Sequence, residues 1–92
     1  MLRTFADKDT ERFWNLEYVP RFQAFAKIAE RKLRMLDAAT SLSELVRPPA
    51  NRLEKLRGDR AGQHSIRIND QWRVCFRWEA PHAYDVEITD YH

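Results

Sequence analysis

The last third of the chain, from Gln63 to His92, alternates apolar and polar residues in three consecutive stretches. A period of two places the apolar side chains on one face of a pleated sheet, so these stretches predict three antiparallel strands. The apolar positions are Ile66, Ile68, Trp72, Val74, Phe76, Trp78, Tyr84, Val86 and Ile88. One face of the predicted sheet must therefore be covered by another part of the chain.

The turns between these strands set which residues face each other. A three-residue turn at 69–71 matches the apolar faces, whereas a two-residue turn would set an isoleucine against an arginine. In this register Arg67 lies opposite Arg73, and Arg77 faces Asp85 if the next turn keeps the same parity. Two facing arginines repel each other, so a sheet that tolerates them is expected to offer them an anionic group such as a phosphate.

The first half of the chain carries a helical pattern that supplies the cover. A short edge strand is predicted at 2–6, followed by a helix that Asp7 or Asp9 caps and that ends at Tyr18. Pro20 suits the first position of a second helix. Its apolar stripe recurs at intervals of three and four residues: Phe22, Phe25, Ala29, Leu33 and Leu36. We expect the two helices to cover the apolar face of the sheet.

Short elements are predicted between the helices and the sheet. Ser41 and Glu44 are spaced as a capping box for one further helical turn. A short strand at 53–56 and a tight turn at 57–60 lead into the strands, with Gly58 the residue suited to a positive φ. No repeat or domain boundary interrupts the pattern, so residues 1–92 are expected to form a single α+β domain.

Composition is that of a small globular protein. Ninety-two residues with 12% aromatic side chains can bury one modest core. The single cysteine, Cys75, excludes an internal disulfide and suits a reducing compartment. It is interpreted as a packing residue, because no histidine accompanies it in the strand pattern. No signal peptide, transmembrane run or lipidation motif is found, so a cytoplasmic location without membrane contact is expected.

The net charge of +2 conceals one strongly basic segment. From Arg47 to Arg77, eight Lys and Arg residues outnumber three acids, a local charge of +5, while the rest of the chain carries −3. A localised basic region is typical of a nucleic-acid-binding surface. Charge alone is explained equally well by a solvated surface.

Candidate chemistry is concentrated at the C-terminus. The chain has no Gly-rich phosphate loop, paired CxxC or HExxH motif, and its histidines are scattered, so neither a metal nor another cofactor is expected. Asp90, Tyr91 and His92 end the last predicted strand, close to Arg73 and Arg67. RNA is cleaved without a cofactor when a base takes the 2′-OH proton, an acid protonates the leaving oxygen and cations stabilise the phosphate charge. Residue types alone still favour a frayed polar tail for the terminus.

Several motifs together resemble the HigB-type toxins of bacterial toxin–antitoxin pairs, within the RelE-like superfamily. They are Leu53-Glu54-Lys55-Leu56-Arg57-Gly58-Asp59-Arg60, Trp72-Arg73-Val74 with Phe76, Ala83-Tyr84-Asp85 and Asp90-Tyr91-His92. With 37–40 and the overall length, the resemblance spans nearly the whole chain. It implies a RelE-like fold, in which an N-terminal helical hairpin packs on one face of a curved, mainly antiparallel sheet of three to five strands.

The resemblance also implies a function and partners. The expected activity is that of a ribosome-dependent endoribonuclease, an mRNA interferase that cleaves translated mRNA on the 70S ribosome without a metal and so inhibits translation. The expected partner is a HigA-type helix-turn-helix antitoxin that neutralises the toxin. Operator DNA is expected to be contacted only through this antitoxin.

Site residues are assigned by matching positions to the family's motifs. The catalytic candidates are His92, Asp90, Tyr91, Arg73 and Glu54, and the RNA-binding candidates are Arg57, Lys55, Arg60 and Arg67. His92 is interpreted as the proton-transfer group, Asp90 as its partner and Tyr91 as an aromatic that positions a nucleotide. Arg73 is the charge stabiliser.

Glu54 departs from the pattern, because some members of the family have a histidine there. A carboxylate can serve as the general base, or it can pair with Arg57 or Lys55 instead. A disabled site would make the chain a catalytically inert protein that binds RNA or its antitoxin and acts in operon autoregulation. A third alternative is a domain whose basic face docks an acidic protein.

Overall fold

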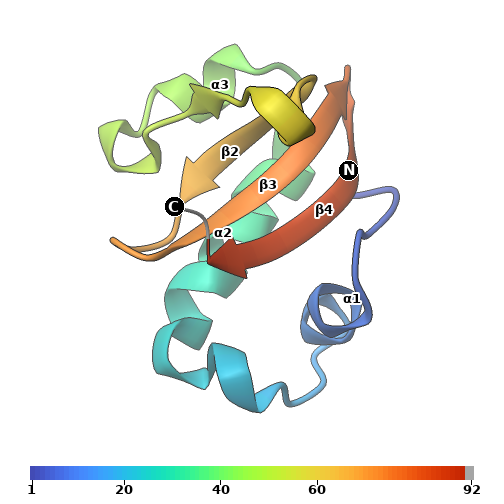
Figure 1. Ribbon diagram of the computed structural model, residues 1–92, viewed down its shortest axis with the longest axis vertical. Coiled ribbons are helices and arrows are strands. Elements are labelled where there is room, and N and C mark those ends of the chain that lie inside the picture. The colour runs from blue at the N-terminus through green and yellow to red at the C-terminus, as the bar shows by residue number, and fades with distance from the viewer. Residues whose placement is uncertain (91–92) are drawn as a thin grey trace.

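The computed structural model describes residues 1–90 and arranges them as a four-stranded antiparallel sheet with helices on one face (Figure 1). Tyr91 and His92 lie outside the described residues. The elements in chain order are α1 (Lys8–Trp14), η1 (Pro20–Phe25), α2 (Ala26–Ala38), α3 (Ser43–Val46), η2 (Pro49–Asn51), β1 (Glu54–Lys55), η3 (Gly58–Arg60), β2 (Gln63–Arg67), β3 (Trp72–Glu79) and β4 (His82–Asp90). Each strand pairs with the next along the chain. The predicted α+β class and mainly antiparallel sheet are confirmed.

The N-terminal residues lie along the outer edge of β4, but they form isolated bridges in place of the short edge strand predicted at 2–6. Leu2 and Phe5 form single parallel bridges with Ala83 and Val86. Helix α1 then docks beside the same strand, where the buried Thr10 hydroxyl accepts a hydrogen bond from the Ile88 N–H at 3.0 Å. Within residues 1–90, no helix has the length and hydropathy to cross a bilayer.

Helix α1 begins and ends at residues with identifiable caps. The Asp7 carboxylate accepts a hydrogen bond from the Thr10 N–H at 2.7 Å, which confirms one of the two predicted caps. The helix ends at Trp14 and not at Tyr18, because Leu16 adopts a left-handed φ of 69° and closes a Schellman-type turn. In that turn the Glu17 N–H donates to the Arg12 carbonyl at 2.9 Å.

The apolar stripe of the second helical segment covers the sheet as predicted. Phe22, Phe25, Ala29, Leu33 and Leu36 are all buried in one cluster with residues of β2, β3 and β4. The segment is not one continuous helix: the backbone of Phe25, with a φ of −130°, separates the 3-10 turn η1 from α2. Each large apolar side chain buried here stabilises the fold by about 1.5–3 kcal/mol. This layer leaves the opposite face of the sheet available.

The predicted turn at 69–71 is confirmed. Ile66 pairs with Val74 and Arg67 with Arg73, so the two arginines face each other across β2 and β3. The Asn69 carboxamide oxygen closes the turn by accepting hydrogen bonds from the backbone N–H groups of residues 71 and 72, each at 2.8 Å.

The expected parity of the next hairpin is wrong. The β3–β4 register shifts beyond Cys75, and Asp85 takes a positive φ of 53°, which inserts an extra residue in β4. Ala83 therefore occupies the core in place of Tyr84. Arg77 pairs with Tyr84 in the ladder, although its side chain still forms an ion pair with Asp85, with Nε and Oδ2 2.9 Å apart.

The connecting elements follow the sequence closely. The Glu44 carboxylate accepts hydrogen bonds from the backbone N–H groups of Thr40 and Ser41, at 2.8 and 2.9 Å, which is one half of the predicted capping box. Strand β1 is only two residues long. Gly58 has a φ of 65°, as the predicted turn requires.

Candidate functional site

The face of the sheet away from α2 carries two neighbouring rows of mainly polar residues, and each row runs across the strands. Residues directly opposite each other on paired strands project from the same face. One row consists of Glu54, Ser65, Cys75 and Glu87, and the next consists of Arg67, Arg73 and Thr89. The pairing therefore gathers three predicted site residues, Glu54, Arg67 and Arg73, on one surface.

Arg73 is the central cation of this surface and is only 9% exposed. Its Nε donates a hydrogen bond to the Ser65 hydroxyl at 2.7 Å, and its Nη2 donates to the Arg52 carbonyl at 2.6 Å. Among residues 1–90, the two N–H groups on Nη1 make no hydrogen bond. The guanidinium is thus held rigidly, with donors left for an anion.

A cavity of about 300 Å³ opens beside this guanidinium. Its walls are formed by Arg52, Glu54, Arg67, Asn69, Asp70 and Arg73. Two carboxylates offset the facing arginines: Arg67 forms an ion pair with Asp70, and Arg73 Nη2 lies 3.8 Å from Glu54 Oε1. The protein itself therefore supplies anionic partners for the facing arginines, while three guanidinium groups against two carboxylates leave the cavity basic.

Glu54 does not take either of the ion-pair partners considered from the sequence. Alternation along β1 directs Glu54 toward the row of Ser65, whereas Lys55 pairs with His64 on the opposite face. The Glu54 carboxylate is 53% exposed, and among residues 1–90 it forms an ion pair with Arg73. It therefore forms part of the wall of the cavity beside Arg73.

The RNA-binding candidates are not all brought together. Arg67 lines the cavity, and the exposed Arg57 lies just before η3. Arg60 is engaged with β4, since its Nη1 donates to Glu87 Oε1 at 3.1 Å. Lys55 is exposed at the edge strand but projects from the other face of the sheet.

Asp90 lies at the end of β4, opposite Trp72. Its Oδ2 accepts a hydrogen bond from Gln71 Nε2 at 2.8 Å. The neighbouring Thr89 is the residue that pairs with Arg73, so the pleat directs Asp90 to the face of Trp72, opposite the face that carries Arg73. The expected closeness of Asp90 to Arg73 and Arg67 on one face is therefore wrong. The other two candidates of the terminus, Tyr91 and His92, lie beyond the part of the chain that the structure describes.

Ser65, Arg52 and Asn69 are part of the site and were not among its predicted residues. Arg52 lay within the basic segment, but its contribution includes a backbone carbonyl that no side-chain pattern marks. Ser65 is distinguished only by being fully buried on the polar face of the sheet. Burial is not visible in the sequence, so Ser65 could not be predicted.

Cys75 lies in the polar-face row but is chemically inert. Burial raises the pKa of its thiol to about 11, so the reactive thiolate is scarce near neutral pH. This fits the packing role expected of it. Within residues 1–90, no group of three or more His, Cys, Asp or Glu side chains is arranged to hold a metal ion.

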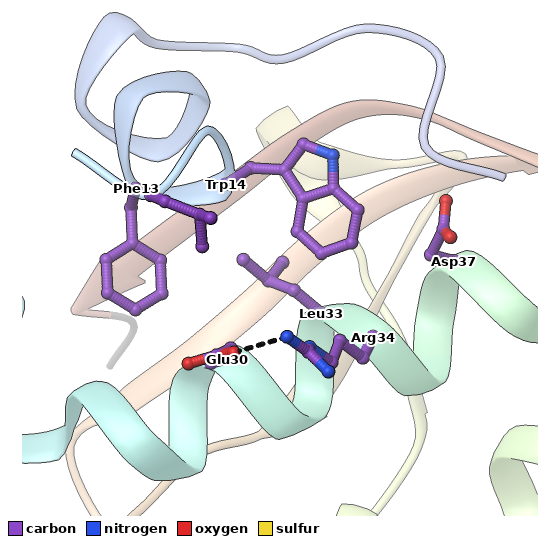
Figure 2. A pocket seen from close by; sticks show the side chains of 7 residues that line it. Phe13, Trp14, Glu30, Leu33, Arg34 and Asp37 are labelled. Carbon is purple, nitrogen blue, oxygen red and sulfur yellow. Dashed lines mark ion pairs between the residues drawn. The ribbon is translucent and has the colours of Figure 1, made fainter.

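A second cavity, of about 370 Å³, lies between α1 and α2 on the helical side of the sheet (Figure 2). Its walls are Phe13, Trp14, Leu16, Glu30, Leu33, Arg34 and Asp37. Glu30 and Arg34 pair with each other at 2.8 Å, which leaves little charge to attract a phosphate. Leu16, one of the residues that line it, is 81% exposed.

His64 makes the stability of the fold depend on pH. Its ring stacks on Phe76, its Nδ1 is buried without a hydrogen-bond partner among residues 1–90, and burial together with Lys55 lowers its pKa. The unfolded chain therefore binds a proton more readily, so this stability is complete above about pH 6.5 and is lost as pH falls through the lower folded pKa.

We expect the urea midpoint to fall more between pH 7 and pH 5 in the wild-type protein than in His64→Phe, which keeps the stacking. Urea denaturation followed by tryptophan fluorescence at several pH values measures this difference. Parallel curves for the two proteins would rule out His64 as the group responsible.

The comparisons with known proteins agree with this fold and with the family resemblance. Residues 3–92 match a family described as the RelE-like toxin of type II toxin-antitoxin system HigB. The chain is 40% identical over 80 residues to Toxin HigB-1 of Vibrio cholerae, covering 85% of this chain and 84% of the relative. It is 38% identical over 61 residues to Endoribonuclease HigB of Proteus vulgaris, covering 66% of this chain and 65% of that relative.

Two solved structures share the fold. The YoeB–YefM complex from Staphylococcus aureus matches with a TM-score of 0.58 at 22% identity, covering 100% of this chain and 98% of that one. The YoeB/ParE toxin from Agrobacterium tumefaciens matches with a TM-score of 0.57 at 19% sequence identity, covering 99% of this chain and 98% of that one. The resemblance to HigB-type toxins is confirmed. The chain therefore belongs to the HigB-like family of RelE-like toxins of type II toxin–antitoxin systems.

Proposed function

We propose that this toxin is an endoribonuclease that cleaves mRNA while a ribosome translates it. The observation that carries the proposal is the buried Arg73 guanidinium, which faces a basic cavity with donors to spare. The name of the Proteus relative, Endoribonuclease HigB, supports the reaction class. A cavity of this size and charge suits one phosphate of an RNA backbone better than a folded protein partner.

Charge stabilisation is the proposed role of Arg73. When the 2′-OH attacks the adjacent phosphorus, negative charge grows on the non-bridging oxygens, and fixed donors aimed at that charge stabilise the transition state. The Nη1 groups are suited to this role, because Nε and Nη2 are already engaged. Arg67 lies opposite Arg73 and is suited to bind the same phosphate or its neighbour.

We assign proton transfer to the imidazole and carboxylate side chains of the site, in a reaction that uses no metal. His92 is the proposed proton-transfer group, with Asp90 as its partner and Tyr91 as the stacking surface for a nucleotide. These three roles rest on the family resemblance. Glu54 is the candidate base, because its exposed carboxylate lies 3.8 Å from Arg73 and remains near any phosphate bound there.

The wider basic surface is proposed to hold RNA. Arg57 is exposed just before η3, and Arg60 lies on that turn. Lys55 is exposed at the edge strand, on the other face of the sheet from the cavity. These cations suit the backbones of mRNA and of ribosomal RNA in the 70S particle, whose phosphates carry one negative charge each.

The proposed partner is a HigA-type helix-turn-helix antitoxin, through which alone the toxin contacts operator DNA. The apolar cavity at Leu16 supports a protein-binding surface on the helical side of the sheet. A protein bound there leaves the cavity of Arg73 on the other side of the sheet uncovered.

The proposal is tested by brief expression of the wild-type chain in bacteria, followed by mapping of new 5′ ends. We expect in-frame cuts in translated messages, no cuts in the same message without its start codon, and suppression of both cuts and growth arrest by the antitoxin. Cuts in the untranslated message would refute ribosome dependence. Growth arrest with no cuts would refute the nuclease.

One observation favours a second candidate, a catalytically inert protein that binds RNA or its antitoxin. Glu54 pairs with Arg73 and so places a negative charge beside the proposed phosphate position. If that repulsion dominates, RNA binding is salt-sensitive but no cleavage follows. The mapping experiment separates the two candidates.

A further inference from the structure

A buried lysine lies behind the site, on the helical side of the sheet. Lys32 of α2 is only 7% exposed, and its Nζ donates a hydrogen bond to Asn51 Oδ1 at 2.6 Å. Burial, with Arg31 and Arg67 nearby, lowers the pKa of this ammonium. Burying a cation against a neutral amide costs free energy, so an apolar residue would serve packing alone better.

Asn51 transmits this contact to the loop before β1. It is fully buried, and its Nδ2 donates to the Leu45 carbonyl at 3.0 Å. Asn51 thereby joins α2, through Lys32, to the end of α3 and to η2. One side chain therefore fixes where the chain leaves η2.

The next residue, Arg52, makes contact with the site. It adopts a left-handed backbone conformation, with φ 43° and ψ 55°, which is unfavourable for a residue with a side chain. This conformation directs its carbonyl to Arg73 Nη2, at 2.6 Å. The Arg52 conformation must be held by its surroundings, and the adjacent Asn51 is buried and hydrogen-bonded to both Lys32 and the Leu45 carbonyl.

We propose that Lys32 and Asn51 are positioning residues for Arg73. They hold Arg52 in its left-handed conformation, so that its carbonyl and Ser65 together aim the free donors of Arg73 into the cavity. Neither Lys32 nor Asn51 lines that cavity. The effect on cleavage rests on the proposed function, whereas the effect on the guanidinium does not.

The test compares Lys32→Met, which keeps the unbranched stem, with Lys27→Met, an exposed lysine on the same helix. Two quantities are measured: hydrogen exchange of the Arg73 Nε–H by NMR, and the cleavage rate at saturating message in a reconstituted translation system. A hydrogen-bonded N–H exchanges slowly as long as its partners are held in place.

In Lys32→Met, we expect the Arg73 Nε–H to exchange about 10-fold faster than in the wild type. The rate of message cleavage should fall about 10- to 100-fold, because small displacements of a catalytic group have effects of that order. Lys27→Met should match the wild type in both. Lys32→Gln keeps a hydrogen-bond donor for Asn51, so it should show the same changes to a smaller extent. This variant takes the place of Lys32→Met if the methionine variant does not fold.

Unchanged Arg73 Nε–H exchange in a folded Lys32 variant overturns the proposal, whatever the cleavage rate. Faster exchange with an unchanged cleavage rate also overturns it, because the position of Arg73 would then not matter to the reaction. If the wild-type chain cuts no RNA, the proposed function fails, while the exchange measurement still decides whether Lys32 positions Arg73.

Discussion

Replacing Arg73 by alanine is expected to lower the rate of RNA cleavage by roughly 10²- to 10³-fold, the loss typical of removing one preorganised donor to transition-state charge. The guanidinium is buried and held by Ser65 and the Arg52 carbonyl, so it needs no reorganisation when the phosphate charge develops. Single-turnover cleavage of a translated message measures the effect.

Arg77→Ala is the matched control for this variant. Arg77 lies on the same strand, but it is exposed and pairs with Asp85. An exposed ion pair contributes about 0–1 kcal/mol, so this variant should fold and cleave nearly as the wild type does. Equal losses in the two variants, with both proteins folded by circular dichroism, would contradict a special role for Arg73.

Replacing His92 by glutamine is expected to lower cleavage by roughly 10²- to 10⁴-fold, the range typical of general acid–base groups. Imidazole exchanges a proton near neutral pH, whereas a carboxamide does not. The rate should be measured between pH 5 and pH 9, because the variant should lack any titration that depends on an imidazole, whose unperturbed pKa is about 6.5.

His82→Gln serves as the control, since His82 begins β4 and faces Glu79 at the far end of the hairpin from Asp90. Its substitution should leave both the rate and the pH profile unchanged. A His92 variant with wild-type rate and titration would move the proton transfer to Glu54. In that case the departure of Glu54 from the family pattern would be a functional substitution.

The sequence by itself determined the elements whose pattern repeats locally. Alternation with period two defined the strands, and the requirement that Ile66 face Val74 set the first turn and with it the facing arginines. The helical stripe from Phe22 to Leu36 and the positive φ of Gly58 follow from equally local causes. Each depends on residues only a few positions apart, so each is visible in the sequence.

Family motifs marked Arg73 and Glu54 as candidate site residues but did not show how they are placed. The extra residue at Asp85, which moves Ala83 into the core, leaves no mark in an alternating pattern. The backbone of Leu16 likewise takes a left-handed conformation that glycine would usually adopt. Both depend on how β4 and α1 fit against the rest of the sheet.

Only the tertiary structure decided the surroundings of Arg73. Arg73 is bonded to the Arg52 carbonyl, and Lys32 is bonded to Asn51 in the same loop. Each of these contacts joins residues about twenty positions apart. Such contacts form because helix and sheet bury their apolar faces together, which brings α2, η2 and β3 within reach of one another. The sequence thus marked Arg73 as a candidate, and the packing of the layers determined how its guanidinium is held.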